Sequence, residues 1–584
     1  MKKVIDKIND LVKDKFEKYG YDRKYGFVTV SNRPDLCQFQ CNGALAAAKE
    51  YKKSPRDIAN DVLSEIKDIQ IFQDISIAGP GFININITDD FLTNYINNIY
   101  SDKKLGITES QNPMTIMIDY GGANVAKPLH VGHLRPAIIG ESLKRTSRYL
   151  GHRVIGDVHL GDWGLQMGMV ISEVKRRNPD LPYFDENFNG EYPEEAPFTI
   201  DELEEIYPAA SKLAKSNGDA MKEAREATSK LQKGNRGYLA LWKHILNVSV
   251  KDLKKNYSDL NVEFDLWKGE SDCQQYIDEM IGYLKDNNYT EESEGTLVID
   301  VAKEDDNQPM PPFMVLKSDG STLYSTTDLA TIWERVKDYS PDEIIYVVDK
   351  RQGLHFEQVF RCAKKTKIVD ENLKFYFLSN GTINGKDGKP FKTRDGGVMR
   401  LRTLIDTITN HVRNKLKNNN SLSSEEMNDI AKKVGLSALK FGDLSNQITK
   451  DYIFDMAKFS SFEGKTGPYI LYTVVRIKSI LRKVDVDKTS DIINPHSDIE
   501  RDLMLSLSKF NEVVESAFID KAPNKMCEYI YEVANQFNKF YHNTKMITEE
   551  NMEKKMSWIN LSNLTKDVLE TGLDLLGIEA PDRM

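Results

Sequence analysis

A chain of 584 residues is too long for a single hydrophobic core, so several domains of about 100–200 residues each are expected. Its residues are 40% hydrophobic and 29% charged, as in globular proteins, and no run approaches the roughly 18 apolar residues of a membrane span, so no membrane partner is expected. The net charge of −10 gives no general attraction to nucleic acid, so such a partner would need a local basic surface.

The N-terminus and the cysteines indicate the cellular compartment. Residues 1–20 include acidic side chains and have apolar side chains spaced as in an amphipathic helix, unlike a signal or transit peptide, so a cytoplasmic location is expected. The five cysteines are odd in number and scattered, and the pair Cys37 and Cys41 has no second pair with which to bind zinc. We expect buried or idle thiols and no bound metal.

Residues 1–110 are predicted to form a small N-terminal α/β domain. A helix near residues 54–66 begins with Ser54 as its N-cap, and residues 83–88 alternate apolar and polar side chains like a half-buried strand. The polar stretch 101–113 contains Gly and Pro without periodicity, which indicates a linker.

Residues 111–400 are predicted to form a doubly wound α/β domain. Short apolar runs that are typical of buried strands occur at residues 115–119, 153–158, 343–349 and 374–378. Helical stretches alternate with these runs, which favours a parallel sheet. The charged, mostly helical stretch at about 171–300 is not needed by the sheet and is interpreted as an insertion.

The sequence NVAKPLHVGHLR, residues 124–135, lies between the first predicted strand of this sheet and the helix that follows. Ligands of parallel sheets bind beyond the carboxyl ends of the strands, and helix N-termini favour anions. His130 and His133 can donate hydrogen bonds to anionic oxygens, while Gly132 leaves room for a flat ring or a close backbone approach. This arrangement suits a nucleoside triphosphate. A metal pair and two structural histidines are the alternatives.

From about residue 401 onward, strand patterns nearly vanish and amphipathic helices predominate. We expect a helical stem at residues 401–458 and an all-α domain at residues 459–584. Cations and aromatic side chains that could bind RNA gather on or beside one helical stretch: Lys465, Tyr469, Tyr472, Arg476, Lys478, Arg482 and Lys483. Taken alone, such a stretch is more often a solvated helix face.

Six segments resemble the arginyl-tRNA synthetases, a family of class I aminoacyl-tRNA synthetases. They are residues 41–49 with 78–87, 124–135 with 159–168, 324–335, 346–360, 388–401, and 464–477 with 576–584. In this resemblance HVGH is the counterpart of the class I HIGH motif, and the segments follow the family order over essentially the whole chain. The resemblance implies a class I Rossmann-like parallel-sheet catalytic domain, a small N-terminal α/β domain that binds tRNA, and an all-α C-terminal anticodon-binding domain.

The resemblance also implies a pocket for L-arginine. Asp119, Tyr324 and Asp328 match positions that contact the substrate side chain, while Asn124 and Gln352 match positions that hold its α-amino and carboxylate groups. Carboxylates suit this role because a guanidinium is a planar, permanently charged fork of donors. Taken singly, each carboxylate is also a candidate helix cap or surface charge, and Asp328 is a candidate cap for the helix that follows it.

The second class I signature, usually KMSKS, matches PFKTRDGG at residues 390–397, which lacks the second lysine. The resemblance implies that Lys127 supplies the missing positive charge. The residues implied to bind ATP or to assist catalysis are therefore Lys127, His130, Gly132, His133, Lys392 and Arg394. Mg²⁺ is expected to share the neutralisation of the triphosphate.

The implied reaction joins L-arginine to tRNA(Arg) at the expense of ATP. The arginine carboxylate attacks the α-phosphate to give arginyl-adenylate and diphosphate, and the 2′-hydroxyl of the terminal adenosine then takes the arginyl group and releases AMP. Lys465, Tyr469, Arg476 and Lys478 are the implied tRNA contacts, and activation is expected to wait for tRNA. A monomer is expected.

Three alternatives stay open at this point. The chain could be another class I synthetase, such as a cysteinyl or glutamyl enzyme, although no zinc-binding cysteine set is present. It could be a small-molecule nucleotidyltransferase with the same histidine loop, which would not need the helical tRNA module. It could also be a non-catalytic relative, against which the intact His130, His133, Asp328 and Gln352 argue.

Overall fold

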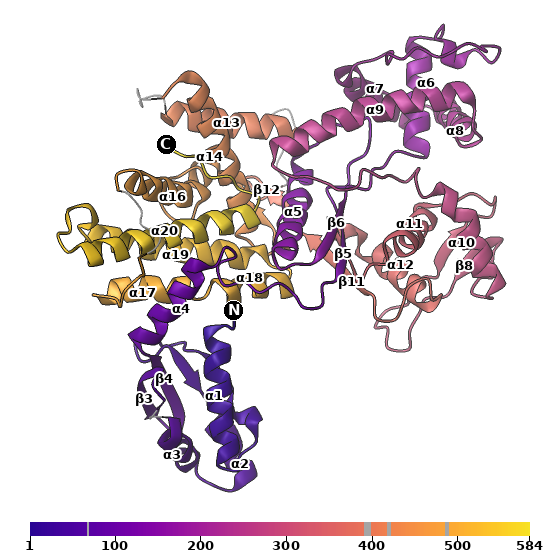
Figure 1. Cartoon of the computed structure of the whole chain (residues 1–584). Coiled ribbons are helices and arrows are strands. Elements are labelled where there is room, and N and C mark those ends of the chain that lie inside the picture. The colour runs from indigo at the N-terminus through magenta and orange to yellow at the C-terminus, as the bar shows by residue number, and fades with distance from the viewer. Residues whose placement is uncertain (67–68, 390–398, 417–421, 485–489) are drawn as a thin grey trace. The chain divides into compact units, whose positions relative to one another are not determined.

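The computed structural model describes residues 1–66, 69–389, 399–416, 422–484 and 490–584. The chain divides into two compact units, drawn in Figure 1. The first unit combines residues 1–109, 461–574 and 579–584, and the second combines residues 110–460 and 575–578. The predicted catalytic residues Lys392 and Arg394 lie outside the described residues. The boundaries of the four predicted domains stay predictions.

An antiparallel sheet and its covering helices form the N-terminal part of the first unit, with strand order β1-β2-β4-β3. The strands are β1 (Val28–Val30), β2 (Phe39–Cys41), β3 (Phe72–Ala78) and β4 (Phe82–Ile87), and the helices are α1 (Val4–Lys18), α2 (Gly43–Tyr51), α3 (Pro55–Ile66) and α4 (Asp89–Ser101). The predicted N-cap is confirmed, because Ser54 Oγ accepts a hydrogen bond from the Asp57 N–H at 3.1 Å. The predicted alternating segment is also a strand, with Ile83, Ile85 and Ile87 buried.

The C-terminal part of the first unit is helical, as predicted. Its helices are α16 (Gly467–Leu481), α17 (Asp498–Leu507), α18 (Phe510–Ile519), α19 (Pro523–Asn543) and α20 (Met552–Leu575). Phe537 and Phe540 of α19 are fully buried and belong to the hydrophobic core of this part. The helices join the N-terminal part through polar contacts such as Arg501 Nε to Asp89 Oδ1 at 2.6 Å.

A parallel sheet with strand order β11-β10-β5-β6 lies at the centre of the second unit. Its strands are β5 (Thr115–Tyr120), β6 (Arg153–Asp157), β10 (Glu343–Asp349) and β11 (Lys374–Asn380), which confirms the strands predicted for this domain. After β5 the chain continues to β6 on one side of the sheet, and after β10 it continues to β11 on the other side. The strand order therefore reverses between β5 and β10. In such sheets the crevice beyond the carboxyl ends of the strands at the reversal is the expected ligand site.

Helices cover both faces of this sheet. Met117, Ile155 and Ile344 pack on one face into a core with α10 (Gln274–Asp286), α11 (Tyr324–Tyr339) and α12 (Gly353–Lys365). On the other face, Tyr120 lies against α5 (Leu134–Tyr149), where a Cβ at Gly140 would come within 2.1 Å of the tyrosine ring. The glycine therefore allows α5 to approach the strand that precedes the histidine motif.

The predicted insertion is mostly helical, as expected. Its helices are α6 (Leu165–Arg177), α7 (Ile200–Ser216), α8 (Gly218–Gln232), α9 (Arg236–Asp259) and α10. It also leads into a small antiparallel sheet of β7 (Glu291–Ser293), β8 (Thr296–Ile299) and β9 (Phe313–Leu316). These strands are three or four residues long, too short for a period-2 pattern to predict them.

The stem that follows the second signature contains α13 (Leu401–Leu416), α14 (Ser424–Leu444) and α15 (Met456–Phe459). The sequence indicates helices alone here, yet the two-residue strand β13 (Tyr452–Ile453) pairs in parallel with β12 (Ile383–Asn384). Among the described helices, none has the length and apolar character needed to span a membrane. All five cysteines are buried, in agreement with the prediction of unreactive thiols.

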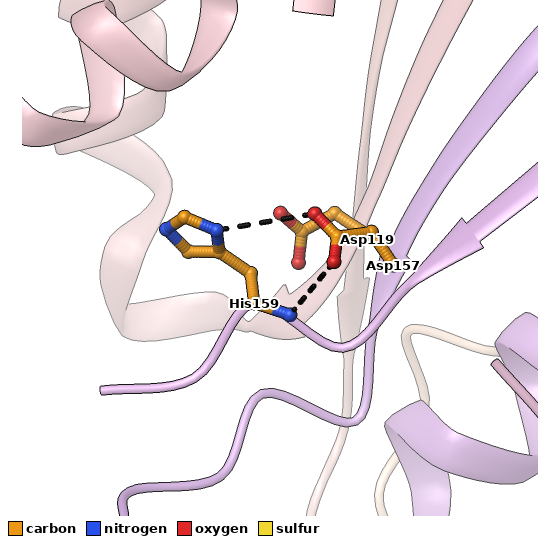
Figure 2. Close-up of side chains that lie close together, drawn as sticks. All are labelled: Asp119, Asp157 and His159. Carbon is orange, nitrogen blue, oxygen red and sulfur yellow. Dashed lines mark hydrogen bonds and ion pairs between the residues drawn. The ribbon is translucent and has the colours of Figure 1, made fainter. Parts of the chain in front are cut away.

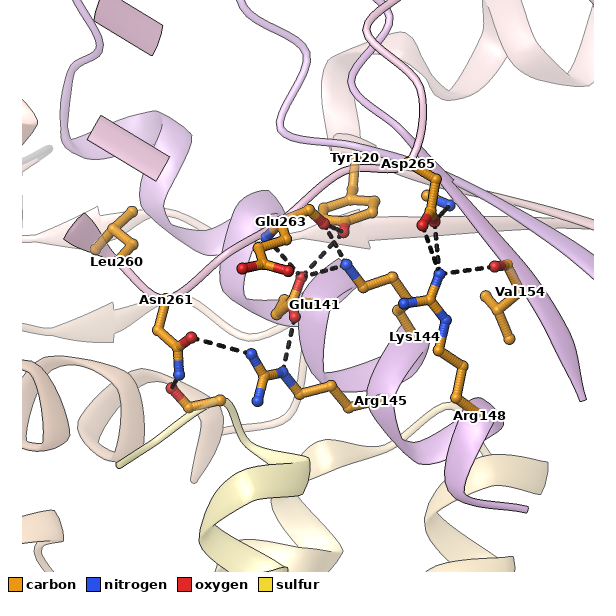
Figure 3. A network of polar contacts seen from close by, with 12 residues as sticks. Tyr120, Glu141, Lys144, Arg145, Arg148, Val154, Leu260, Asn261, Glu263 and Asp265 are labelled. Atoms are coloured by element: carbon orange, nitrogen blue, oxygen red, sulfur yellow. Dashed lines mark hydrogen bonds and ion pairs between the residues drawn. The ribbon is translucent and has the colours of Figure 1, made fainter. Parts of the chain in front are cut away.

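A buried polar network anchors α5 to the segment after α9 (Figure 3). The Glu141 carboxylate pairs with Lys144 Nζ at 2.9 Å and with Arg145 Nε at 2.7 Å, and the Lys144 side chain is only 3% exposed. Tyr120 Oη donates to Glu141 and to the Glu263 carbonyl at 3.1 and 2.7 Å. Because α5 begins directly after His133, this network fixes the helix whose first turn carries the motif.

Glu141→Ala is expected to lower the free energy of unfolding of the second unit by about 3 kcal/mol, because the buried Lys144 ammonium loses its carboxylate. Burial raises the pKa of Glu141, but Lys144 and Arg145 outweigh it and hold the pKa below the ordinary value. The stabilisation is therefore present above pH 4.5 and is lost as the pH falls through the lowered pKa.

The measurement is the urea midpoint of the variant, with Glu173→Ala as its control. Glu173 pairs with Arg176 and Arg177 at the same i+3 and i+4 spacing, but these arginines are 38% and 37% exposed, so a loss below about 1 kcal/mol is expected. Equal losses for the two variants would contradict the anchoring role of the buried network.

Candidate functional site at the carboxyl end of the parallel sheet

The loop after β5 is strained and is held by its neighbours. Ala126 has a φ of +59°, which is unfavourable for a residue with a Cβ, and its N–H donates to Ser249 Oγ of α9 at 2.9 Å. Asn124 pairs with Gly161, where a Cβ would lie 2.2 Å from Asn124 Oδ1. The predicted substrate residue Asn124 thus lies directly beside the segment 159–168.

His133 ends the turn η2 (Val131–His133) at the start of α5, and His130 immediately precedes this turn, with the two ring centroids 4.0 Å apart. The Nδ1 atom of His133 accepts a hydrogen bond from the His130 N–H, and the Nδ1 atom of His130 accepts one from the Gly132 N–H, both at 3.0 Å. Since each Nδ1 is an acceptor, each neutral ring has its proton on Nε2. The motif therefore presents two Nε2–H donors, and the occupied Nδ1 atoms disfavour the metal-pair alternative.

Both histidines are neutral near pH 7. Burial lowers the pKa of His130, and the Lys127 ammonium lowers it further. Burial lowers the pKa of His133 to about 3, with His130 and Lys127 adding to the effect. Lys127 is therefore close enough to act on both rings. A Cβ at Gly132 would lie 2.8 Å from the His130 ring, so the glycine allows this ring to lie close to the turn, and the role of Gly132 in binding ATP stays a prediction.

The end of the second signature segment lies beside this motif. The Val131 N–H donates to the Met399 carbonyl at 3.0 Å, and the Leu401 N–H donates to the Leu129 carbonyl at 2.9 Å. His130 and Arg400 pair between these two hydrogen bonds. The roles of Lys392 and Arg394, in the preceding segment outside the described residues, stay predictions.

The N-terminal ends of α11 and α12 carry most of the predicted arginine pocket. Asp328 Oδ2 lies 2.5 Å from His355 Nε2, and the His355 ring meets the Tyr324 ring edge-on at 4.8 Å. Gln352 ends the turn η4 (Lys350–Gln352) immediately before α12. Because α11 begins at Tyr324, Asp328 lies in its second turn, and the helix-cap alternative for Asp328 is wrong.

Asp119 has a guanidinium partner within the protein. It aligns with Asp157 on β6 and Tyr346 on β10, and Arg335 of α11 donates to Asp119 and Asp157 at 2.6 and 2.8 Å. Burial raises the pKa of Asp119 although Arg335 opposes the shift. A direct contact between Asp119 and the substrate guanidinium stays a prediction.

Figure 2 shows Asp119 and Asp157 beside His159, whose φ is +38°. Within the described part of the chain, these three side chains form the group that could hold a metal ion, with ligand atoms within 4.8 Å of one another. The buried Arg335 guanidinium already pairs with both carboxylates and brings a positive charge to the place where a cation would bind. The set therefore does not fit a resident divalent cation.

Two residues near Asp328, His355 and Glu270, were not predicted from the sequence. His355 follows Gln352 by one turn but has no distinguishing pattern of its own. Glu270 lies in an irregular segment of the predicted insertion, where its N–H donates to the Leu160 carbonyl at 3.0 Å. Burial raises the pKa of Glu270 to about 7, His159 opposes the shift, and the Asp328 carboxylate adds to it. Glu270 is thus a second carboxylate near Asp328.

The side chains predicted to bind tRNA lie on or beside α16, and each already contacts the protein. The contacts are Lys465 with Glu528, Tyr469 Oη with Asn535 Oδ1 (2.8 Å), Arg476 with the Tyr472 and Tyr541 rings (4.8 and 5.2 Å), and Lys478 with Glu570 (2.8 Å). Lys478 is only 16% exposed, whereas Tyr472 is 44% exposed. The basic stretch is thus partly neutralised, and its tRNA contacts stay predictions.

Comparisons with known proteins cover this chain from end to end. The families described as "Arginyl tRNA synthetase N terminal domain", "tRNA synthetases class I (R), catalytic domain" and "DALR anticodon binding domain" match residues 2–87, 95–456 and 470–584. Curated arginine–tRNA ligases of Alkaliphilus oremlandii (strain OhILAs) and Agathobacter rectalis are 68% and 54% identical, over 100% of this chain and of each relative.

Among solved structures, the arginyl-tRNA synthetase from Plasmodium falciparum is 25% identical, covers 100% of both chains and superposes with a TM-score of 0.81. The similarity in fold therefore extends over the whole length of this chain. By these matches the chain belongs to the arginyl-tRNA synthetase family of class I aminoacyl-tRNA synthetases.

Proposed function

We propose that this chain joins L-arginine to tRNA(Arg) with ATP, at the carboxyl end of its parallel sheet. The observation that supports this most is that the second unit contains two sets of suitable groups. One set is the carboxylates of Asp328 and Glu270, and the other is the two neutral donors of His130 and His133. The pocket suits a cationic side chain, and the donors suit a triphosphate. Neither a cysteinyl nor a glutamyl substrate would need two carboxylates.

In the first step, the arginine carboxylate attacks the α-phosphate of ATP and diphosphate leaves. The Nε2–H groups of His130 and His133 donate to the phosphate oxygens on which negative charge grows, and Lys127 adds a full positive charge. Lys392 is proposed to add another. The buried rings stay neutral, so they stabilise charge without first releasing a proton.

Recognition of arginine uses opposite charge and geometry. Asp328 has one oxygen directed to His355, and its other oxygen, together with Glu270, is proposed to take the guanidinium, with Tyr324 covering the flat face. Asn124 and Gln352 are proposed to hold the α-amino and carboxylate groups. Asp119 is proposed to assist through its contact with Arg335, which fixes the α11 helix that bears Asp328.

In the second step, the 2′-hydroxyl of the terminal adenosine attacks the arginyl-adenylate and AMP leaves. Lys465, Tyr469, Arg476 and Lys478 are proposed to contact the tRNA, with the exposed Tyr472 available for stacking on a base. Mg²⁺ is proposed to enter with the ATP phosphates, as this ion usually does, and no step is assigned to a protein-bound metal. A monomer located in the cytoplasm remains part of the proposal.

The Michaelis constant for arginine is expected to rise as the pH falls from about 8 to about 6. Burial raises the pKa of Glu270 to about 7, so a growing share of this group is protonated and neutral below that value, and a neutral carboxyl attracts a guanidinium less. Below the pKa, the rise contributed by this single group approaches about tenfold per pH unit.

The check is the arginine KM measured against pH with ATP and tRNA saturating, in the native enzyme and in Glu270→Gln. The variant is expected to have a raised KM and a flatter profile over this range. His159, Asp328 and Asp162 face Glu270 and are unchanged in the variant. A native profile that is already flat would contradict the assignment of Glu270 to the pocket.

The test of the function itself is charging of total tRNA with labelled amino acids. Label from arginine is expected to enter the acid-precipitable tRNA fraction only when ATP is present, while lysine, glutamate and cysteine leave the tRNA unlabelled. Charging with cysteine or glutamate would indicate another class I synthetase. Binding of ATP without charging of any tRNA would favour a nucleotidyltransferase or a non-catalytic relative.

A further inference from the structure

The Lys127 ammonium lies over an aromatic ring of the helical insertion. Its Nζ is 4.4 Å from the centroid of the Tyr207 ring on α7, within the range of a cation–π interaction. Both side chains are half-buried. Among the salt bridges between described residues, none includes Lys127, so the Tyr207 ring is the neighbour that stabilises its charge.

The same face of α7 also contacts the second signature region. Glu204 precedes Tyr207 by three residues and therefore shares its face of the helix, and it pairs with Arg400 Nη1 at 2.6 Å. Arg400 in turn pairs with His130 along the backbone. One helix face thus contacts residues from both segments that flank the proposed triphosphate site. The insertion also supports the strained turn before Lys127, where Ser249 accepts from the Ala126 N–H.

We propose that Tyr207 is a positioning residue that holds the Lys127 ammonium in place for the triphosphate. This inference rests on the proposed role of Lys127. A lysine stem has four rotatable bonds and costs side-chain entropy to order. An acidic partner would order the stem but neutralise its charge, whereas an aromatic face orders the stem and leaves the full positive charge available to ATP.

Tyr207→Leu is expected to lower kcat/KM for ATP about threefold to tenfold in arginine-dependent diphosphate exchange, with little change in the arginine KM or the melting temperature. Tyr207→Phe keeps the ring and is expected to restore most of the loss. Tyr192→Leu is the matched control, because Tyr192 is a half-buried tyrosine of the same insertion with Arg236 5.1 Å from its ring centroid. Its kcat/KM for ATP is expected to stay near the native value.

A double-mutant cycle distinguishes the positioning role of Tyr207 from the proposed role of Lys127. In a Lys127→Met background, Tyr207→Leu is expected to cause no further loss, because the ring then has no cation to hold. Phenylalanines with increasing ring fluorination at position 207 keep the packing but weaken the negative ring face, so kcat/KM for ATP is expected to fall with each added fluorine.

The outcomes are distinct. If Lys127→Met retains native exchange, the proposed role of Lys127 fails and the inference fails with it. If Lys127→Met loses exchange but Tyr207→Leu and the fluorinated series do not, the inference alone is overturned. An equal loss from Tyr207→Leu in the native and Lys127→Met backgrounds would also overturn it, because Tyr207 would then act independently of the ammonium.

Discussion

His133→Ala is expected to slow arginine activation about 100- to 1000-fold, the loss typical for removal of one donor from a developing oxyanion. The substitution deletes an Nε2–H donor and also removes the Nδ1 acceptor of the His130 N–H, so the neighbouring donor loses its orientation. The affinity for tRNA is expected to stay close to native. The readouts are single-turnover adenylate formation and filter binding of tRNA.

The control for this variant is His244→Ala. His244 lies in the insertion, where its Nε2 is 3.0 Å from the Pro193 carbonyl, far in sequence from both signature segments. It is expected to leave adenylate formation near the native rate. His133→Asn keeps an N–H donor and is expected to lose less than His133→Ala. Native turnover in His133→Ala would remove His133 from the catalytic residues.

Asp328→Asn is expected to raise the arginine KM about 30-fold to 5000-fold, because a desolvated guanidinium loses its charged partner at a cost of roughly 2–5 kcal/mol. The change keeps the size of the side chain and removes the charge that also faces His355. The KM for ATP is expected to change much less, since the proposed nucleotide donors lie in η2 and in the loop that precedes it. Diphosphate exchange at varied arginine, then at varied ATP, measures both constants.

Asp338→Asn serves as the matched control, because Asp338 is an exposed carboxylate in the last turns of the same helix, α11. Its arginine KM is expected to equal the native value. If Asp328→Asn also kept the native arginine KM, the pocket would have to be placed elsewhere, and the proposed pairing of Asp328 with Glu270 would fail.

The main sheet was predictable because its strands are continuous apolar runs. Residues 343–349 are buried over most of their length, and this gives a strong local signal. The strands β7, β8 and β9 gave no such signal, because all three residues of β7 are exposed and the other two strands have four residues each. Their pairing is set by tertiary contacts that no local pattern encodes.

The candidate site likewise contains residues that a local motif predicts and residues that only long-range packing brings together. The positions of His130 and His133 followed from a motif placed between a strand and a helix, a local pattern that the structure matches at η2 and α5. Glu270 and His355 could not be found, because they join the pocket through long-range packing of an irregular segment and a helix start. The pairing of Arg335 with Asp119 could not be predicted either, since the two residues are 216 positions apart in the sequence.

The most direct test of the account is arginine-dependent exchange of labelled diphosphate into ATP, measured with and without total tRNA and repeated with lysine, glutamate and cysteine. Exchange is expected with arginine but not with the other three amino acids, and only when tRNA is present. Arginine exchange without tRNA would keep the activity but contradict its expected dependence on tRNA. Absence of exchange with arginine under every condition would contradict the proposed active site.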